Sequence, residues 1–194
     1  MSILNKISLF IFVIVLITNV SFSQDENVQN DQMQIWMDYM TPGSMHELMA
    51  SGVGEWKTVS KFWMDPAGEP MVTEGSGTTE MILGGRYEKS VHKSTMMGMP
   101  TEGMWLMGYD NATEEFTAIW IDNLGTGTAI AKGTFDENTN SINLIGTMVD
   151  PMTGKYMDFR EVRTHIDENN QLLEMYMTYN GQEFKTMEIE FTKK

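Results

Sequence analysis

Residues with the chemistry of a catalytic site are few and widely spaced in this sequence. It has no cysteine, no Gly-x-Ser-x-Gly motif and only three histidines, His46, His92 and His165. A catalytic triad needs a histidine beside a nucleophile and an orienting acid, and the spacing indicates none. The histidines also form no closely spaced pair of the kind that zinc sites use. We therefore predict no catalytic residue and no metal site. We expect His46 and His165 at the surface, and His92 on the same strand face as Ser90 and Glu88.

Charged residues inside apolar segments are a better indication of a binding site. Arg86, Arg160 and Glu161 lie where apolar residues alternate around them. A charge that faces a protein interior must be paired or ligand-bound, because burying it alone costs several kcal/mol. We predict that these three residues line a cavity or, for the arginines, stack on a tryptophan. Glu174 and Glu188 also lie in strands, but they oppose clearly apolar faces, so solvent-exposed ion pairs are an equal alternative for them.

Aromatic residues supply the remaining predicted walls of the cavity. Trp105, Trp120 and Tyr176 are candidates, and Asp122 shares a strand face with Trp120 at the polar end of the segment 115–123. An apolar wall with a polar group at its opening is typical of a small-molecule pocket. The same pattern also describes an ordinary barrel rim, and both interpretations stay open.

Methionine is unusually abundant, with 20 residues in a chain of 194. Met97 and Met99 lie close to Met96 in what we predict to be a loop, and thioethers are soft ligands that suit Cu(I). Methionine is more often a flexible filler of cores and adaptable binding surfaces. We therefore assign Met97 and Met99 to the cavity lining. A Cu(I) competition titration that shows no tighter binding than a methionine-poor protein would exclude copper.

Short segments rich in aromatic and β-branched residues, separated by turn signals, dominate the chain after Gly54. Period-two alternation is clearest in residues 171–179 and 182–192, which indicates half-buried antiparallel strands. Asn180-Gly181 between them is the strongest hairpin signal, whereas Gly125-Thr126-Gly127 is either a turn or a bulge. Closing ten hairpin-linked strands removes both exposed edges, so we predict an all-β, antiparallel up-and-down barrel. The ten strands are expected near 54–64, 70–83, 85–94, 103–109, 115–123, 127–136, 141–149, 155–166, 171–179 and 182–192.

The N-terminal region predicts export. Lys6 is the only charge in residues 1–23, and an apolar run too short to span a bilayer follows it, ending in small residues. We expect a signal peptide over 1–23, with an uncleaved anchor as the alternative. Residues 24–43 are predicted to be a polar leader followed by a short helix with Met33, Trp36, Met37 and Met40 on one face. Residues 44–194 form the single barrel domain, which begins with a second short helix capped by Ser44 and Glu47.

Net charge excludes some partners. The formal charge is −14, and it becomes −15 when Lys6 leaves with the signal. A nucleic-acid-binding protein needs a basic surface, so that class is excluded, and anionic lipid headgroups are disfavoured. We expect a secreted or periplasmic protein with no integral membrane segment after signal cleavage.

Specific motifs connect the chain to known proteins. Gly54-Glu55-Trp56 at the start of the first strand resembles the lipocalin and calycin signature, in which the tryptophan packs across the closed barrel end under an arginine, here Arg160 or Arg163. The chain from about residue 45 onward resembles a bacterial lipocalin-like family, domain of unknown function fifteen-seventy-nine. The matching motifs include MILGGRY at 81–87, GYDN at 108–111, DPMTGK at 150–155 and the segment from Gly181 to Ile189. The resemblance implies a barrel and brings no known reaction.

The leading hypothesis is therefore a barrel that binds a small apolar molecule and holds no resident cofactor. An enzyme that uses Asp122, Glu161 and Arg86 for acid–base chemistry is the second hypothesis. A non-catalytic interaction module for envelope proteins, with a large exposed apolar patch, is the third. Haem binding is a variant of the first hypothesis, which a colourless protein from haem-supplemented expression would exclude.

Overall fold

A computed structural model describes residues 23–179 and 181–194, which form two helices and ten strands. The predicted signal peptide lies outside the described residues except for Ser23. The helices are α1 (Ser23–Met40) and α2 (Ser44–Ser51). The strands are β1 (Gly54–Phe62), β2 (Met71–Ile82), β3 (Tyr87–Met96), β4 (Met99–Asp110), β5 (Glu115–Asp122), β6 (Ala129–Asp136), β7 (Ser141–Val149), β8 (Tyr156–Asp167), β9 (Asn170–Tyr179) and β10 (Gln182–Lys193).

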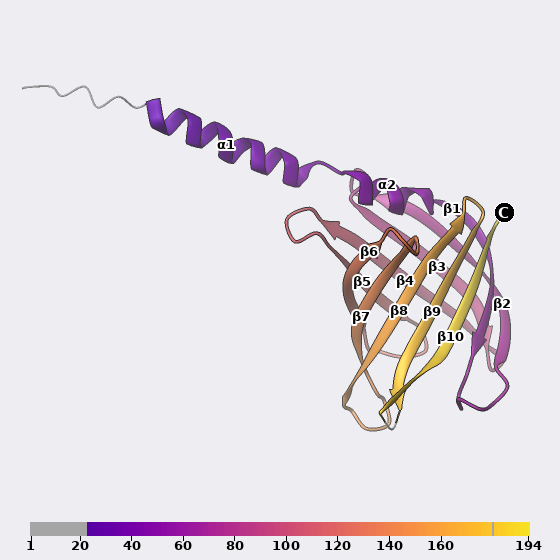
Figure 1. Ribbon diagram of the computed structural model, residues 1–194. Coiled ribbons are helices and arrows are strands. Elements are labelled where there is room, and N and C mark those ends of the chain that lie inside the picture. Colours follow the sequence, from indigo (N-terminus) through magenta and orange to yellow (C-terminus); the bar gives the residue numbers. More distant parts are fainter. Residues whose placement is uncertain (1–22, 180) are drawn as a thin grey trace, which may run out of the picture. The chain divides into compact units, whose positions relative to one another are not determined.

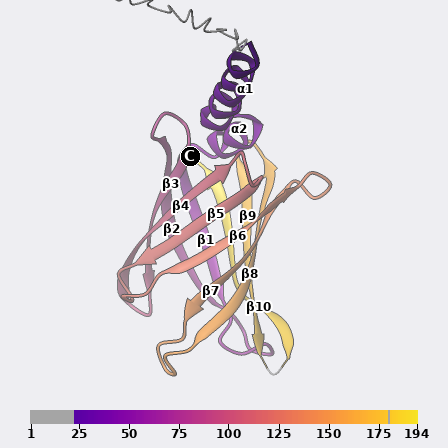
Figure 2. The same ribbon diagram turned by 90° about the vertical axis from the view of Figure 1, so that its left-hand side faces the viewer.

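The ten strands form a closed antiparallel barrel in which each strand pairs with its neighbours in sequence (Figures 1 and 2). The barrel closes where β1 pairs with β10, in a register that runs from Trp56 opposite Lys193 to Phe62 opposite Met187. Every strand edge is therefore paired, which removes the edges that favour aggregation. The predicted all-β, up-and-down barrel is confirmed.

Helix α2 closes one end of the barrel (Figure 1). Its Met49 is fully buried and joins a core that includes Met107 and Phe116, and Met45 and Leu48 pack against the same core. Trp56, only 2% exposed, lies at this end, and its indole Nε1 donates to the Gly52 carbonyl over 2.9 Å. The core therefore lies directly beneath α2.

The N-terminal helices differ from prediction in two details. The expected polar leader is part of α1, which begins at Ser23. The cap of α2 is Gly43 rather than Ser44, and its backbone N–H donates to Nδ1 of His46 over 3.1 Å.

The chain divides after Met37 into two compact units, the second of which contains the barrel. The α1 side chains Met33, Trp36, Met37 and Met40 are all exposed. None of the described helices is both long enough and apolar enough to cross a membrane.

Two turns also differ from expectation. Met97-Gly98 is a two-residue hairpin with φ values of 51° and 80°, so β3 and β4 extend to Met96 and Met99 where we predicted a longer loop. The segment Gly125–Gly127 is part of the loop between β5 and β6, so it is a turn and not a bulge.

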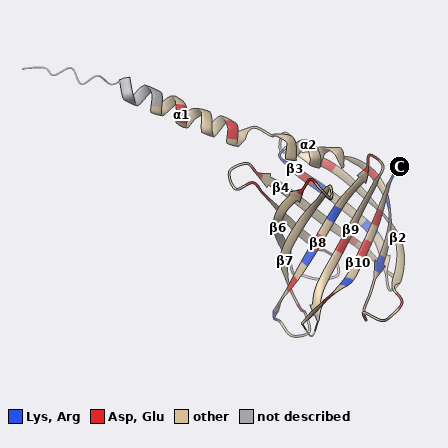
Figure 3. Cartoon of the chain, in the orientation of Figure 1, with Lys and Arg blue, Asp and Glu red and all other residues tan. Residues whose placement is uncertain are grey.

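Acidic and basic residues gather along β8, β9 and β10 (Figure 3), and ion pairs join these strands and β1 on the outer face. Lys61 contacts Glu188 at 2.8 Å, and Lys185 contacts both Glu188 and Glu174. The two glutamates therefore form the solvent-facing cross-strand pairs that were one of the two alternatives. Pairs of this kind contribute little stability individually.

Candidate ligand-binding cavity

A cavity of about 640 Å³ lies inside the barrel and reaches from the end opposite α2 to Trp56, Glu88 and Gln171 near the α2 end. It is lined by the inward side chains of all strands and by the β5–β6 loop residues from Leu124 to Thr128, together with Pro151 of the β7–β8 loop. Those loops lie at the end opposite α2, because hairpin turns alternate between the two ends of an up-and-down barrel. We call this open end the mouth. The volume lies in the range of pockets that bind small molecules.

The cavity has two chemically different walls. On β1 to β4, small hydroxyl side chains are the most frequent lining residues. On β7 to β10, the lining is apolar and rich in methionine. The first set, here the hydroxyl wall, comprises Thr58, Ser60, Thr79, Ser90, Ser94 and Thr101, and the second, the methionine wall, comprises Met148, Phe159, Leu173, Met175, Met187 and Ile189.

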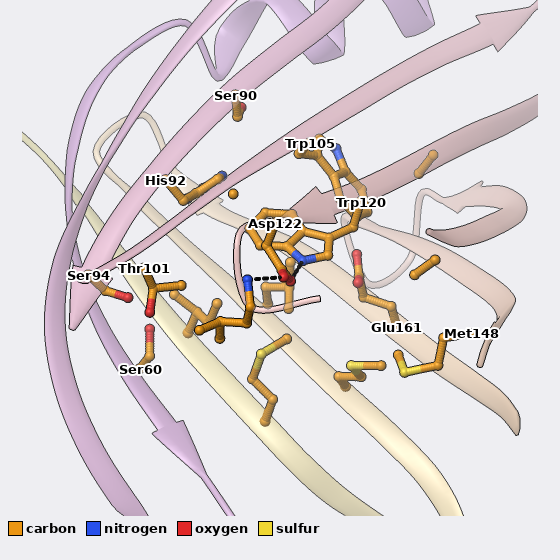
Figure 4. Close-up of a pocket in the computed structure, with 18 of the residues that line it drawn as sticks. Ser60, Ser90, His92, Ser94, Thr101, Trp105, Trp120, Asp122, Met148 and Glu161 are labelled. Carbon is orange, nitrogen blue, oxygen red and sulfur yellow. Dashed lines mark hydrogen bonds between the residues drawn. The ribbon is translucent and has the colours of Figure 1, made fainter. Parts of the chain in front are cut away.

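Figure 4 shows the hydroxyls of Ser60, Ser94 and Thr101 gathered on one side of the cavity near the mouth. Among the described residues, the Ser60 and Ser94 hydroxyls have no hydrogen-bonding partner, whereas Thr101 Oγ1 donates to the Met99 carbonyl over 3.3 Å. This side can therefore offer donors and acceptors to a bound molecule.

Aromatic rings form a connected group between the walls. The His92 ring centroid lies 5.6 Å from that of Trp120 and 5.8 Å from that of Phe191. Glycines make this packing possible: Gly77 and Gly103 flank His92 in register on β2 and β4. A Cβ on Gly103 would lie 2.2 Å from Cζ2 of Trp120, so the indole ring occupies the space that a side chain there would fill.

A buried ion pair forms the floor of the cavity. Arg163 Nη1 on β8 donates to Glu88 Oε1 on β3 over 2.6 Å, which joins two walls across the barrel. Nε and Nη2 of Arg163 both donate to Gln171 Oε1, at 3.1 and 3.0 Å. Glu88 and Gln171 together accept hydrogen bonds from the buried Arg163 guanidinium. Glu88 Oε2 has no hydrogen-bonding partner among the described residues.

Glu161 lies two residues nearer the mouth than Arg163 on the inner face of β8, and its side chain is 4% exposed. Its neighbours in register are Leu144 on β7 and Met175 on β9. Glu161 Oε1 has no hydrogen-bonding partner among the described residues. Burial raises the pKa of Glu161 to about 8, and the charge of Arg163 opposes that rise. The carboxyl is therefore mostly protonated at neutral pH.

Asp122 lies at the mouth, where its carboxylate is fully engaged. Oδ2 accepts the Trp120 indole N–H over 2.7 Å, and Oδ1 accepts the backbone N–H groups of Leu124 and Gly125 over 2.9 and 3.2 Å (Figure 4). Asp122 thus fixes both the Trp120 ring and the start of the β5–β6 loop.

The histidines are more buried than predicted. His46 and His165 are 5% and 8% exposed, so their predicted surface location is wrong. His46 is held by its bond to Gly43, and His165 continues the inward phase of Glu161 and Arg163 along β8. Burial, assisted by the charge of Arg163, lowers the pKa of His165 and of the cavity residue His92 to about 4. Both are neutral at pH 7.

Four of the predicted binding residues line the cavity, namely Trp105, Trp120, Asp122 and Glu161. Five others do not. Arg86 is exposed in the β2–β3 turn at the α2 end, where it donates to backbone carbonyls, including that of Met40 over 2.5 Å. Arg160 has the opposite strand phase to Glu161, forms a bidentate pair with Glu183 and stacks 4.0 Å from the Tyr176 ring on the outer face.

Met97 and Met99 are 67% and 52% exposed at the β3–β4 hairpin, outside the cavity lining, whereas Met96 faces inward.

The cation over Trp56 is Lys193 at 5.4 Å, in place of the expected arginine. Within the described residues, no group of three or more His, Asp or Glu side chains is arranged to hold a metal ion.

Sequence reasoning missed Arg163, Ser60 and Ser94 as cavity residues. The signal for Arg163 was available, because it shares the phase of Glu161 and the apolar Phe159 on β8. The same signal was available for Ser60, in phase with Trp56 on β1, and for Ser94, in phase with His92 on β3, but small hydroxyl residues are equally common on outer strand faces.

The model of the family described as "Protein of unknown function (DUF1579)" matches residues 41–193. This chain belongs to the DUF1579 family. The match covers α2 and every strand of the barrel, which are the elements that build the cavity. A search of curated proteins finds no match.

The crystal structure of Rv2717c from M. tuberculosis is similar in fold, with a TM-score of 0.58 and 12% sequence identity. The alignment covers 79% of this chain and 99% of that one. At this identity the likeness supports the DUF1579 barrel fold alone.

Proposed function

We propose that this DUF1579 protein binds a small, mostly apolar molecule inside its barrel. The observation that carries the proposal is the cavity of about 640 Å³ between the methionine wall and the aromatic group. Methionine side chains adapt to ligands of different shape, and burial of apolar surface supplies the affinity at about 25 cal/mol per Å². The hydroxyl wall and Glu161 provide the few polar groups that orient a ligand.

The test is binding of N-phenyl-1-naphthylamine, a neutral apolar fluorophore, to the purified full chain. Ser94 faces the cavity near the mouth and the adjacent Thr95 is exposed on the outside of the same strand. Ser94→Trp should weaken binding about tenfold or more, equivalent to about 1.4 kcal/mol, because its ring fills cavity space. The matched control Thr95→Trp should bind as the unmodified protein does. Equal binding by both variants would contradict an internal site.

Native mass spectrometry of protein purified from its own host would identify the natural ligand. Addition of haem to the same protein tests the haem variant, for which His92 is the cavity histidine. A Soret band that disappears in His92→Ala would replace the apolar-ligand proposal with a haem protein.

The alternative of a cavity enzyme needs Asp122, Glu161 and Arg86 in one site, and the three residues do not lie together. Asp122 and Glu161 line the same cavity, but Arg86 lies in the β2–β3 turn outside it. The proposed oxyanion residue therefore has no access to the other two. We favour binding without catalysis.

We further propose that the protein acts outside the cytoplasm. The support is the order of Lys6, apolar run and small residues in the first 23 positions. Cleavage after Ser23 would leave Gln24 as the mature N-terminus.

A further inference from the structure

We infer that the Glu161 carboxyl is a hydrogen-bond donor to the ligand, and that the ligand is a neutral, mostly apolar molecule carrying a carbonyl oxygen. This inference rests on the proposed function, because it identifies the polar group of the molecule that occupies the cavity. It assigns a specificity-determining role to a single side chain.

The first step is the position of Glu161. It lies one layer above the Arg163–Glu88 bridge, on the side of the mouth, and it lines the cavity. Figure 4 shows its carboxyl directed from β8 into the space between the walls, below Trp105 and Trp120. A ligand that enters from the mouth reaches this carboxyl before it reaches the floor.

The second step is the absence of a partner. With the side chain 4% exposed, Glu161 Oε1 has no hydrogen bond among the described residues. The nearby Arg163 is already engaged by Glu88 and Gln171. A buried polar group without a partner is costly, and the protein retains one here, at the inner end of a cavity.

The third step is the charge of the surroundings. The titratable side chains that line the same interior are Arg163 from β8, Glu88, His92 and Lys93 from β3, and Asp122 from β5. Arg163 is paired with Glu88, and Asp122 is engaged by three N–H groups. Among the described residues, none of these groups has an ion pair or hydrogen bond with Glu161.

These facts favour the neutral acid over the carboxylate. A protonated carboxyl in an apolar site is a hydrogen-bond donor, and a ligand carbonyl accepts that bond without requiring a buried charge. Raising the pH through the Glu161 pKa of about 8 removes the donor proton. His92, with a pKa of about 4, does not titrate in this range.

Three probes that differ only at the central carbon test the inference: benzophenone, diphenylmethane and benzhydrylamine. Each is titrated against the full chain by displacement of N-phenyl-1-naphthylamine. At pH 6.5, we expect benzophenone to bind up to about tenfold more tightly than diphenylmethane, the effect of one buried hydrogen bond. This preference should disappear as the pH rises above 8.

Variants separate the donor from its surroundings. Glu161→Gln retains a donor, so the benzophenone preference should persist and become independent of pH. Glu161→Leu has no donor, so it should bind benzophenone and diphenylmethane equally well. Glu80→Gln, an exposed carboxyl on the outer face of β2, is the matched control and should behave as the unmodified protein does.

The outcomes distinguish the two proposals. If diphenylmethane does not bind at all, the proposed apolar site is wrong. If diphenylmethane binds but the benzophenone preference is absent or survives in Glu161→Leu, the site stands and the donor role is wrong. If benzhydrylamine binds most tightly and gains affinity as Glu161 ionises, Glu161 is an anionic site for an amine.

Discussion

At the scale of single residues, Glu161 determines how the interior responds to pH. A glutamate in the unfolded chain ionises near pH 4.5, whereas Glu161 in the folded protein keeps its proton until about pH 8. Between these values the folded state binds more protons, so the free energy of unfolding falls as the pH rises. His92 and His165, whose pKa values are lowered, act in the opposite direction, and their effect fades as the pH rises above the ordinary histidine value of 6.5.

We therefore expect urea denaturation to give a free energy of unfolding that falls, relative to that of Glu161→Gln, by roughly 1.6 kcal/mol between pH 6.5 and 8. This is less than about 1.36 kcal/mol per pH unit because Glu161 is half ionised at pH 8. Residue 161 does not titrate in Glu161→Gln, so the stability of this variant follows only the histidines and should not decline over that range. A decline of equal slope in both proteins would assign the effect to another group.

Arg163 is the second residue on which the interior depends. Removing one partner of a buried ion pair leaves the other charge uncompensated, so Arg163→Met should cost about 3–5 kcal/mol in urea denaturation. The double variant Glu88→Met with Arg163→Met should recover much of that loss. Arg160→Met removes the exposed pair with Glu183 and should cost about 1 kcal/mol or less. If both arginine variants cost the same, the floor bridge is not structural.

At the scale of elements, glycines determine where the aromatic rings lie. Gly103→Ala would place a Cβ 2.2 Å from Trp120 Cζ2, so the ring must move from the position in which it donates to Asp122 over 2.7 Å. We expect a loss of roughly 1–3 kcal/mol from overpacking and a shift of the tryptophan emission maximum. Gly127→Ala in the β5–β6 loop, where a Cβ meets nothing within 4 Å, is the control. An unchanged emission spectrum in Gly103→Ala would show that the ring is not fixed there.

Strands and turns were largely predictable because both follow local rules. Alternation located most of the ten strands, and turn chemistry located most of the hairpins. The Met97-Gly98 hairpin was missed because methionine rarely adopts a positive φ, and only the pairing of Met96 with Met99 requires it here.

The site residues divide according to strand phase. Trp120 and Asp122 were predicted together because they share a face of one strand. Arg160 and its neighbour Glu161 were both predicted to face the cavity. Adjacent strand residues point to opposite faces, so only one of the two predictions could be right. Arg86 was assigned to a strand, but the positive φ values of Leu83, Gly84 and Gly85 turn the chain before it. Contacts across the barrel, such as Arg163 with Glu88, depend on closure, which no local pattern encodes.

At the scale of the whole molecule, export is the prediction most directly tested. Mass spectrometry of protein recovered from the periplasm or medium should give a chain that begins at Gln24. Replacing Val13 with Arg interrupts the apolar run and should retain the precursor in the cytoplasm. An intact N-terminus in membrane-bound protein would support the uncleaved anchor.

The distribution of methionine around the barrel offers a test of both closure and ligand binding. Met64, Met97 and Met152 are 82%, 67% and 90% exposed in the connections at the mouth, whereas Met49 and Met107 in the core are 0% and 1% exposed. Oxidation to the sulfoxide follows exposure. A brief peroxide treatment, followed by peptide mass spectrometry, should modify the first three and spare the last two.

The methionine wall lies between these extremes, and its response to a ligand is informative. Met175 and Met187 are partly exposed and line the cavity. Saturation with N-phenyl-1-naphthylamine should slow their oxidation severalfold, because a bound molecule covers their sulfur atoms. Oxidation of Met64 and Met152 should continue at the same rate, since neither is among the side chains that line the cavity. Protection of Met64 and Met152 in place of Met175 and Met187 would locate binding at the exposed rim and contradict an internal ligand.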